Sequence, residues 1–261
     1  HDWADGLLLT DEEIDAERGV IEEEWRSRQN GDMRLFKKSL PTMYNSTKYA
    51  DRMPIGTMEI IENFKYKTLR DFYHDWYRTD LQAIAIVGDI DVAEIEAKIE
   101  KLFSPIPAIK NPLPRIVVEI PDNSKMLYNL GMDKEITTST ILFNINHPKS
   151  LKDETVGDLQ ESIYSSMVAE MLSARLREIA QKPDAPFMSA SASYRSLARV
   201  NNTFGLYISP KPNQQQEAFK SALTELNRAV KFGFTQAEID RTISVYENYY
   251  QTKITKLDQT S

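Results

Sequence analysis

A cluster of prolines near the middle of this chain limits the folds that it can adopt. The prolines are Pro105, Pro107, Pro112 and Pro114. Each one fixes φ and removes a backbone N–H donor, so the stretch can continue neither a helix nor a central strand. A chain of 261 residues is long enough for two domains. We therefore expect one domain over 1–104, a linker over 105–115, and a second domain over 116–261 that is cut short at its C-terminus.

The first part of the chain reads as a series of helices with one strand. Thr10 is a good N-cap, and Glu13 follows it at the spacing of a capping box, which predicts a helix over 11–30. The run LQAIAIVGD at 81–89 is almost continuously apolar and ends in Gly-Asp, which is typical of a buried strand. Further helices are expected over 32–41, 57–63, 68–77 and 92–103.

The second part alternates strands with long helices. Strands are expected over 116–120, 125–133, 137–146, 187–196 and 203–209. Helices are expected over 153–180, 216–232 and 235–255, with Gly233 ending one and Thr235 opening the next. This order indicates an α+β sandwich, in which helices cover one face of a mostly antiparallel sheet.

Composition excludes several classes of protein. No run approaches the roughly 18 apolar residues of a membrane helix, so no membrane span is expected in this segment. A net charge of −7 without a Lys/Arg cluster argues against nucleic-acid binding. The chain has no cysteine, which excludes thiolate catalysis, disulfides and Cys-ligated zinc within it. The missing thiols favour a periplasmic or cell-envelope setting, although many cytoplasmic segments also lack cysteine.

Two glutamates in the first helix stand where apolar residues are expected. Glu17 and Glu24 are seven residues apart and fall within about 20° of each other on one helix face. Ile14, Val20 and other apolar residues lie within about 80° of Glu17, so the two acids interrupt the apolar stripe. A carboxylate turned toward a core must be paired, hydrogen-bonded or bound to a metal. A buried salt bridge, or a stripe that bends toward solvent, explains the pattern without a metal.

Several segments, taken in order, resemble one known family. They are ERGVIEEEWR at 17–26, YADRMPIGT at 49–57, LRDFYHDWY at 69–77 with AIVGD at 85–89, MLSARLRE at 171–178 and FTQAEIDR at 234–241. The chain is identified by them as similar to the pitrilysin or insulinase family of zinc metallopeptidases, the inverzincins of peptidase family M16. The matches extend from about residue 10 to residue 250. The resemblance implies two α/β sandwich domains of the pitrilysin type, the first of them incomplete at its N-terminus.

The resemblance also implies a role for the two glutamates. The family binds zinc through two histidines of an upstream HxxEH motif, which also supplies the general-base glutamate, and through a third, downstream glutamate. Matched residue by residue, Glu24 falls on the third zinc ligand, and Glu17 falls on a second acid that supports catalysis. The chain contains no HxxEH, and its histidines, His1, His74 and His147, are isolated ones of the kind that lie at surfaces or in hydrogen bonds. The motif is expected before residue 1, in a longer protein.

The function implied is that of a zinc-dependent metalloendopeptidase. It would cleave peptides or unfolded polypeptides held in a chamber between two homologous halves, which belong to one chain or to two subunits. This segment would be part of the N-terminal, catalytic-type half. With one of the three ligands, it is predicted to hold no zinc and to be inactive by itself. The alternative is a non-catalytic scaffold, or a peptide-holding partner of an active subunit.

Overall fold

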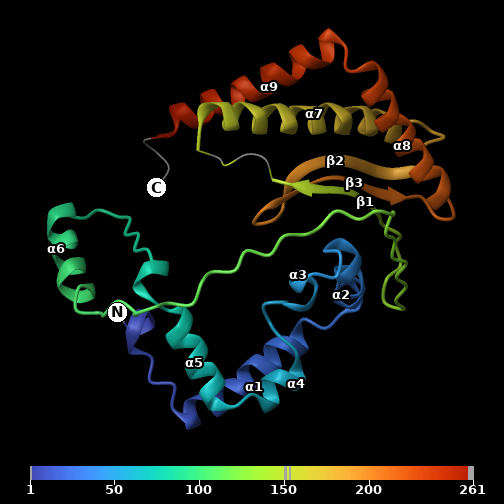
Figure 1. Cartoon of the computed structure of the whole chain (residues 1–261). Coiled ribbons are helices and arrows are strands. Elements are labelled where there is room, and N and C mark those ends of the chain that lie inside the picture. Colours follow the sequence, from blue (N-terminus) through green and yellow to red (C-terminus); the bar gives the residue numbers. More distant parts are fainter. Residues whose placement is uncertain (1, 150–151, 153, 258–261) are drawn as a thin grey trace. The chain divides into compact units, whose positions relative to one another are not determined.

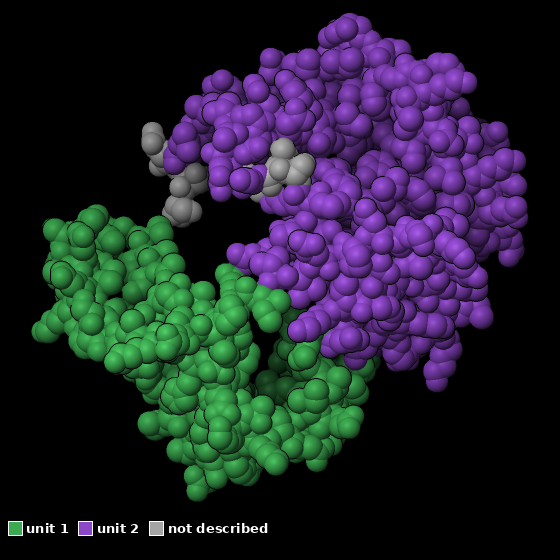
Figure 2. Space-filling model, viewed as in Figure 1, with its two compact units in different colours: residues 1–29, 52–116, 258–261 green, residues 30–51, 117–257 purple. Residues whose placement is uncertain are grey.

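The computed structural model describes residues 2–149, 152 and 154–257. The chain forms two compact units (Figure 1; Figure 2). Unit 1 consists of residues 1–29, 52–116 and 258–261, and unit 2 consists of residues 30–51 and 117–257. The chain therefore leaves unit 1 after α1, returns to it, and enters unit 2 a second time at Val117.

The regular structure of unit 1 is helical in its described part. Its longest helix is α1 (Asp11–Ser27), and the side chain of Thr10 caps it by accepting a hydrogen bond from the backbone N–H of Glu13 at 3.3 Å. The side chain of Asp91 caps α6 in the same way. The helices predicted from sequence in this part are confirmed to within a few residues at each end. Its elements are Asp2–Gly6, α1, α4 (Met58–Asn63), α5 (Tyr66–Trp76), Thr79–Leu81 and α6 (Val92–Phe103).

Unit 1 buries few side chains. Ile14 of α1, Ile61 of α4 and Tyr73 of α5 are its buried apolar residues in the described part of the chain. The Tyr73 hydroxyl donates to the carbonyl oxygen of Trp3 at 3.2 Å, which holds the N-terminal turn near α5. The three residues come from three different helices and do not belong to the hydrophobic cluster of the described residues.

The strand expected over 81–89 is absent from the structure, and that prediction is wrong here. Residues 82–91 are irregular, and Ile84, Ile86 and Val87 are 45%, 47% and 81% exposed. A strand requires a neighbour to pair its backbone N–H and C=O groups. The described part of unit 1 contains no strand that could be this neighbour.

Unit 2 is an α+β sandwich, which confirms the predicted fold class. Its three strands form an antiparallel sheet in the order β1-β3-β2. Ile145 of β1 lies opposite Phe204 of β3, which in turn lies opposite Tyr194 of β2. The elements of unit 2 are α2 (Gly31–Met43), α3 (Lys48–Asp51), β1 (Ile141–Pro148), α7 (Val156–Ala180), β2 (Phe187–Ala198), β3 (Asn201–Pro210), α8 (Gln215–Phe232) and α9 (Gln236–Thr255).

The core of unit 2 lies between this sheet and the helices α7 and α8 (Figure 1). Its members share almost complete burial and are Leu172, Leu176, Phe187, Ala190, Leu206, Ile208, Ala218 and Ala222. The Ser173 hydroxyl, on α7, donates to the carbonyl oxygen of Ala192 at 3.1 Å and so joins this helix to β2. Gly233 ends α8 with a φ of +69°, a conformation that side chains with a Cβ rarely adopt. No helix in the described residues is both long and apolar enough to cross a membrane.

Two of the strands expected after the proline-rich linker are also absent. Residues 116–120 and 125–133 are not strands, so these predictions are wrong, and the strand expected over 137–146 begins at Ile141. The apolar residues of 125–133 at alternate positions face outward. Met126, Tyr128, Leu130 and Met132 are each more than three-quarters exposed. The segment has no partner strand in the described sheet.

Charged groups attach residues 30–51 to the rest of unit 2. Arg34 of α2 donates to both carboxylate oxygens of Asp133, at 2.7 and 2.8 Å, and forms an ion pair with Glu135 at 3.0 Å. Glu135 also accepts a hydrogen bond from the backbone N–H of Gly31 at 2.9 Å. A carboxylate at a helix N-terminus is favoured by the helix dipole. The contact with Arg34 lowers the pKa of Asp133 to about 2.

Candidate metal centre

One side of α1 is held against the rest of unit 1. Ile14 is 4% exposed, and Ile21 and Trp25 are half-buried. On a helix these three positions lie within about 40° of one another, so they form one contact face. Helix α1 as a whole is in contact with α4.

Arg18 supplies the main polar contacts of this side. Its guanidinium donates to the carbonyl oxygen of Phe64 at 2.7 Å and to the carbonyl oxygen of Ile61. Its central carbon also lies 3.9 Å from the centre of the Phe64 ring, in a cation–π contact. Arg18 thus holds α1 to the last turn of α4.

A second pair of polar side chains extends this attachment. Asp15 accepts a hydrogen bond from the Tyr66 hydroxyl at 2.6 Å and another from Arg18 Nε at 2.9 Å. The two hydrogen bonds lower the pKa of Asp15, that from Tyr66 most. The same bond to Asp15 raises the pKa of the Tyr66 phenol, because the hydroxyl proton is held by a carboxylate.

The two predicted site residues lie beside this contact face, about 60–80° around α1 from Ile14. Glu17 is exposed, and Glu24 has a side chain that is 40% exposed and forms an ion pair with Arg28 one turn later. Val20, which lies between them in sequence and on the same side, is 58% exposed. Among the explanations that the sequence leaves open, the described residues fit an apolar stripe that bends toward solvent at these positions. The two glutamates stand together on an open face.

This face offers the right kind of donor for zinc but not a complete set. Carboxylate oxygens are ordinary zinc ligands, whereas a zinc site in a protein uses three or four groups. Within the described residues, no three His, Asp or Glu side chains gather closely enough to hold a metal ion. The described residues alone therefore do not assemble a zinc site.

Neither histidine in the described part of the chain belongs to a group of three possible metal ligands. His74 is exposed on α5. His147 belongs to β1 in unit 2, where its Nε2 lies 3.0 Å from the Tyr194 hydroxyl and the two rings stack. His1 lies outside the described residues. The prediction that His74 and His147 are surface or hydrogen-bonded residues is confirmed for both.

Sequence reasoning missed the attachment through Arg18. Asp15 and Arg18 have the i, i+3 spacing of a helical ion pair, which can be recognised in the sequence. The other partners of Arg18 are backbone carbonyls of Ile61 and Phe64, more than forty residues away. Every residue carries a backbone carbonyl, so the sequence contains no feature that marks these two.

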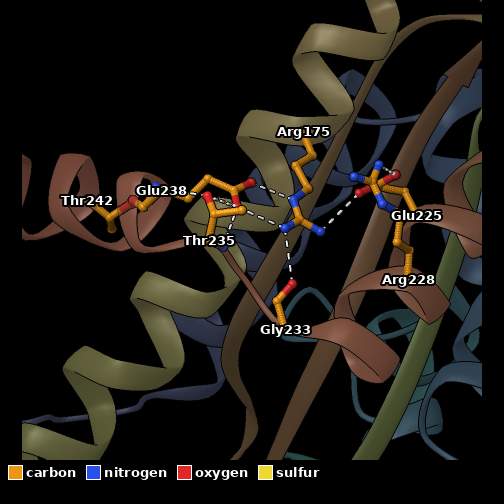
Figure 3. Close-up of polar contacts among 7 residues, drawn as sticks. All are labelled: Arg175, Glu225, Arg228, Gly233, Thr235, Glu238 and Thr242. Carbon is orange, nitrogen blue, oxygen red and sulfur yellow. Dashed lines mark hydrogen bonds and ion pairs between the residues drawn. The ribbon is translucent and has the colours of Figure 1, made fainter.

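A second arginine organises a polar cluster in unit 2 (Figure 3). Arg175 of α7 donates to both carboxylate oxygens of Glu238, at 2.5 and 2.9 Å, to Glu225 at 3.2 Å and to the carbonyl oxygen of Gly233 at 3.0 Å. Glu238 also completes the capping box of α9 with Thr235. These contacts lower the pKa of Glu238 to about 2, chiefly through Arg175. The cluster ties three helices together, so its role is structural.

A shallow pocket of about 440 Å³ borders this cluster. It is lined at the ends of α7 and α8 by residues that include Asp184, Glu217, Lys220 and Glu225. The carboxylate of Glu225 is already occupied by Arg175 and Arg228, each at 3.2 Å. The pocket therefore offers no free buried charge to a ligand.

Known proteins resemble this chain over nearly its whole length. A profile of the protein family described as "Peptidase M16 inactive domain" matches residues 63–246. The chain is 28% identical over 241 residues to "Probable zinc protease PqqL" of Escherichia coli strain K12, covering 92% of this chain and 26% of that protein. It is 28% identical over 202 residues to "Zinc protease PQQL-like" of Arabidopsis thaliana, covering 76% of this chain and 21% of that protein. The chain thus spans about a quarter of the length of these relatives.

Solved structures have the same fold. The first half of the periplasmic protease PqqL from Escherichia coli matches with a TM-score of 0.87 and 25% identity, over 99% of this chain and 55% of that one. Pitrilysin matches with a TM-score of 0.65 and 15% identity, over 91% of this chain and 26% of that one. The family profile begins after α1, whereas the match to the first half of PqqL includes nearly the whole chain.

Proposed function

Because the chain belongs to the peptidase M16 family through its match to the inactive domain, we propose that it is part of a zinc-dependent metalloendopeptidase. Relatives that match most of the chain are named zinc proteases. The chain itself carries the inactive-domain type of sequence over residues 63–246. In the proposed enzyme it contributes one helix to the metal centre and a second domain that helps to hold the substrate.

The observation that carries this proposal is the open face of α1. Glu17 and Glu24 stand one above the other there, while the other side of the helix is fastened by Arg18. We assign Glu24 as a zinc ligand and Glu17 as the acid that supports catalysis beside it. The remaining ligands and the general base come from an HxxEH motif outside this chain. Zinc in such a site lowers the pKa of a bound water and makes it a nucleophile.

The proposed substrate is a peptide or an unfolded polypeptide. It is held in a chamber between this half and a second, homologous half, which lies in the same chain or in another subunit. The match to the first half of a protease supports this arrangement. We place the protein in the periplasm or cell envelope, since the same relative is described as periplasmic. The chain by itself is expected to bind no stoichiometric zinc and to cleave no peptide.

The second candidate is a non-catalytic partner that holds peptide for an active subunit. The description of the matching family region as inactive favours it. The two functions differ in the sequence that precedes α1 in the whole protein. An intact HxxEH there means a protease, and a degraded one means a partner.

Substitutions on α1 test the proposed protease. In the full-length protein, Glu24→Gln is expected to lose most of the zinc and most of the activity, because a neutral amide is a much weaker zinc ligand. Glu17→Gln is expected to keep more zinc yet lose activity. Glu23→Gln is the control, since its side chain is 71% exposed and forms an ion pair with Arg26. The measurements are zinc content by elemental analysis and cleavage of an unfolded polypeptide.

The pattern of zinc content decides between the assignments. If Glu17→Gln empties the site while Glu24→Gln keeps it full, the two roles are reversed. If both variants retain zinc and activity at the level of Glu23→Gln, α1 is not part of the metal centre. Stoichiometric zinc in the 261-residue chain alone would also contradict the proposal.

A further inference from the structure

We propose that Arg18 is a positioning residue that sets the rotation of α1 about its own axis and thereby the direction of Glu17 and Glu24. This inference rests on the proposed function, because the rotation matters only if the two glutamates serve a metal centre. Arg18 lies about 100° around the helix from Glu17, and its guanidinium is engaged by the carbonyl oxygens of Ile61 and Phe64, so the role assigned to it needs no contact with the metal. Its effect passes through the helix backbone.

The hydrogen-bond partners of Arg18 are backbone carbonyl oxygens rather than side chains. The carbonyl oxygens of Ile61 and Phe64 lie at the C-terminal end of α4. The last carbonyls of a helix lack partners within it and carry the negative end of its dipole. A guanidinium therefore satisfies both their hydrogen bonding and their charge, and this end of α4 is a strong anchor for α1.

The geometry of the contact leaves Arg18 little freedom. The guanidinium is planar, its donors point in fixed directions, and its face lies on the Phe64 ring at 3.9 Å. Asp15 holds Arg18 Nε at 2.9 Å and is itself held by the Tyr66 hydroxyl at 2.6 Å. The Arg18 side chain is only 17% exposed. The terminal nitrogens of the guanidinium are thus held by the two carbonyl oxygens, its face by the Phe64 ring, and Nε by Asp15.

Apolar packing around α1 is too sparse to fix the rotation by itself. Ile14 is the one residue of α1 that is buried in the described part of the chain. Gly19, next to Arg18, has no side chain, and a Cβ placed there would meet nothing within 4 Å. Arg70 of α5 contacts the start of the helix by donating to the carbonyl oxygen of Leu9 at 2.9 Å. Arg18 is the polar anchor in the middle of the helix, between Ile14 and Trp25.

A small rotation of α1 would displace the carboxylates of both glutamates. Side chains end about 5–6 Å from a helix axis, so a 10° rotation moves a carboxylate by about 1 Å. A misplacement of that size in a catalytic site can reduce the rate by about a hundredfold. Glu17 and Glu24 lie on the same side of α1, so one rotation moves both in the same direction.

The test uses the full-length protein loaded with zinc and, separately, with Co²⁺, whose visible absorption depends on ligand geometry. Arg18→Lys keeps the charge but replaces the planar fork with a single point donor. We expect kcat to fall by about 10- to 100-fold, with KM and bound metal nearly unchanged, and the cobalt absorption to shift. Arg26→Ala is the control on the same helix, since Arg26 is 59% exposed and pairs with Glu22 and Glu23. It should leave both readouts as in the parent.

A milder variant covers the case in which Arg18 substitutions prevent folding. Tyr66→Phe removes the hydroxyl that holds Asp15 but leaves Arg18 in place, so a smaller loss of kcat and a smaller cobalt shift are expected. The inference is overturned if a folded Arg18→Lys, or Tyr66→Phe where Arg18→Lys does not fold, has the kcat and cobalt spectrum of the parent while Glu24→Gln loses metal. If Glu24→Gln keeps its metal and activity, the proposed function itself fails.

Discussion

The two units of this chain are held together in different ways. Unit 2 has a contiguous apolar core in which Phe187, Leu206 and Ile208 are at most 1% exposed. Unit 1 has three separate buried apolar residues in its described part, and many large ones remain on its surface. Helices that are predicted equally well from sequence can therefore differ greatly in how much apolar burial stabilises them.

Arginine side chains make structural contacts in both units, but with different partners. In unit 1, Arg18 and Arg70 donate to backbone carbonyls, and so does the buried Arg78, which reaches the carbonyl oxygen of Leu113 at 2.8 Å. In unit 2, Arg175 binds the carboxylates of Glu238 and Glu225. The first arrangement fixes the directions of helices where apolar packing is sparse. The second neutralises acids at the edge of a packed core.

The largest effect on stability is expected from Arg175→Ala in unit 2. Glu225 has a side chain that is 7% exposed, and the substitution removes the better buried of its two partners. Breaking a buried ion pair by removing one partner costs about 3–5 kcal/mol, because the remaining charge stays buried. The free energy of unfolding should fall by that amount, as measured by denaturant titration with far-UV circular dichroism and hydrogen exchange of β3.

A matched control and a second probe sharpen this test. Arg177→Ala removes an arginine from the same helix whose side chain is 55% exposed, and it should cost about 0–1 kcal/mol. All three tryptophans, Trp3, Trp25 and Trp76, belong to unit 1, so their fluorescence reports on that unit. If Arg175→Ala shifts the fluorescence midpoint as far as the β3 exchange, the two units unfold together, and the comparison between them fails.

Sequence alone predicted the helices well because their ends are marked by local chemistry. Thr10, Asp91, Thr155 and Thr235 each cap the helix that follows, and Gly233 ends one. Strands depend on partners elsewhere in the chain. The apolar runs at 81–89 and 125–133 have the composition of strands, yet the described residues provide no neighbour for them.

The candidate site was predictable in part, because local helix geometry places its two glutamates together. Glu17 and Glu24 share a helix, so their spacing places them on one face without knowledge of the fold. Whether that face is buried depends on groups outside the helix, so the helix pattern alone could not decide between a buried pair and a stripe that bends toward solvent. Arg18 was missed because its partners are backbone atoms of Ile61 and Phe64.

Low pH is expected to reduce the free energy of unfolding of unit 2, because it protonates the Glu238 carboxylate. Its pKa is lowered from 4.5 to about 2 by Arg175 and by the N-terminus of α9. A carboxylate with a lowered pKa in the folded state stabilises that state fully above its ordinary pKa, and this stabilisation is lost as the pH falls toward the folded-state value. The free energy of unfolding should therefore decline between about pH 4.5 and pH 2.

The pH dependence can be assigned by substitution. Glu238→Gln removes the titrating group, so it lowers stability at pH 6 and flattens the decline below about pH 4.5. Asp133, with a pKa of about 2, contributes in the same direction and is tested by Asp133→Asn. Hydrogen exchange of β3 measured from pH 6 downward, and corrected for intrinsic rates, follows the change. A decline just as steep in the Glu238→Gln, Asp133→Asn double variant would contradict the assignment.

The smallest change in stability is expected from the exposed apolar segment of unit 1. Ile86 and Val87 are 47% and 81% exposed and lie in the irregular stretch 82–91. Replacing both with Thr keeps the β-branched shape and removes apolar surface. The tryptophan-reported free energy of unfolding should change by less than about 0.5 kcal/mol, as for other surface substitutions. Self-association, measured by sedimentation, should decrease, because exposed apolar patches drive association.

The control for this double variant is Val230→Thr, at an exposed position of α8 in unit 2. It should alter neither the free energy of unfolding nor the association state. A loss of more than about 1 kcal/mol in the Ile86→Thr, Val87→Thr variant would mean that these side chains are packed in solution. Residues 81–89 would then form the buried strand that their sequence predicts, paired within the chain or with another copy. Unit 1 would in that case have a core of its own, and its dependence on arginine contacts would be correspondingly smaller.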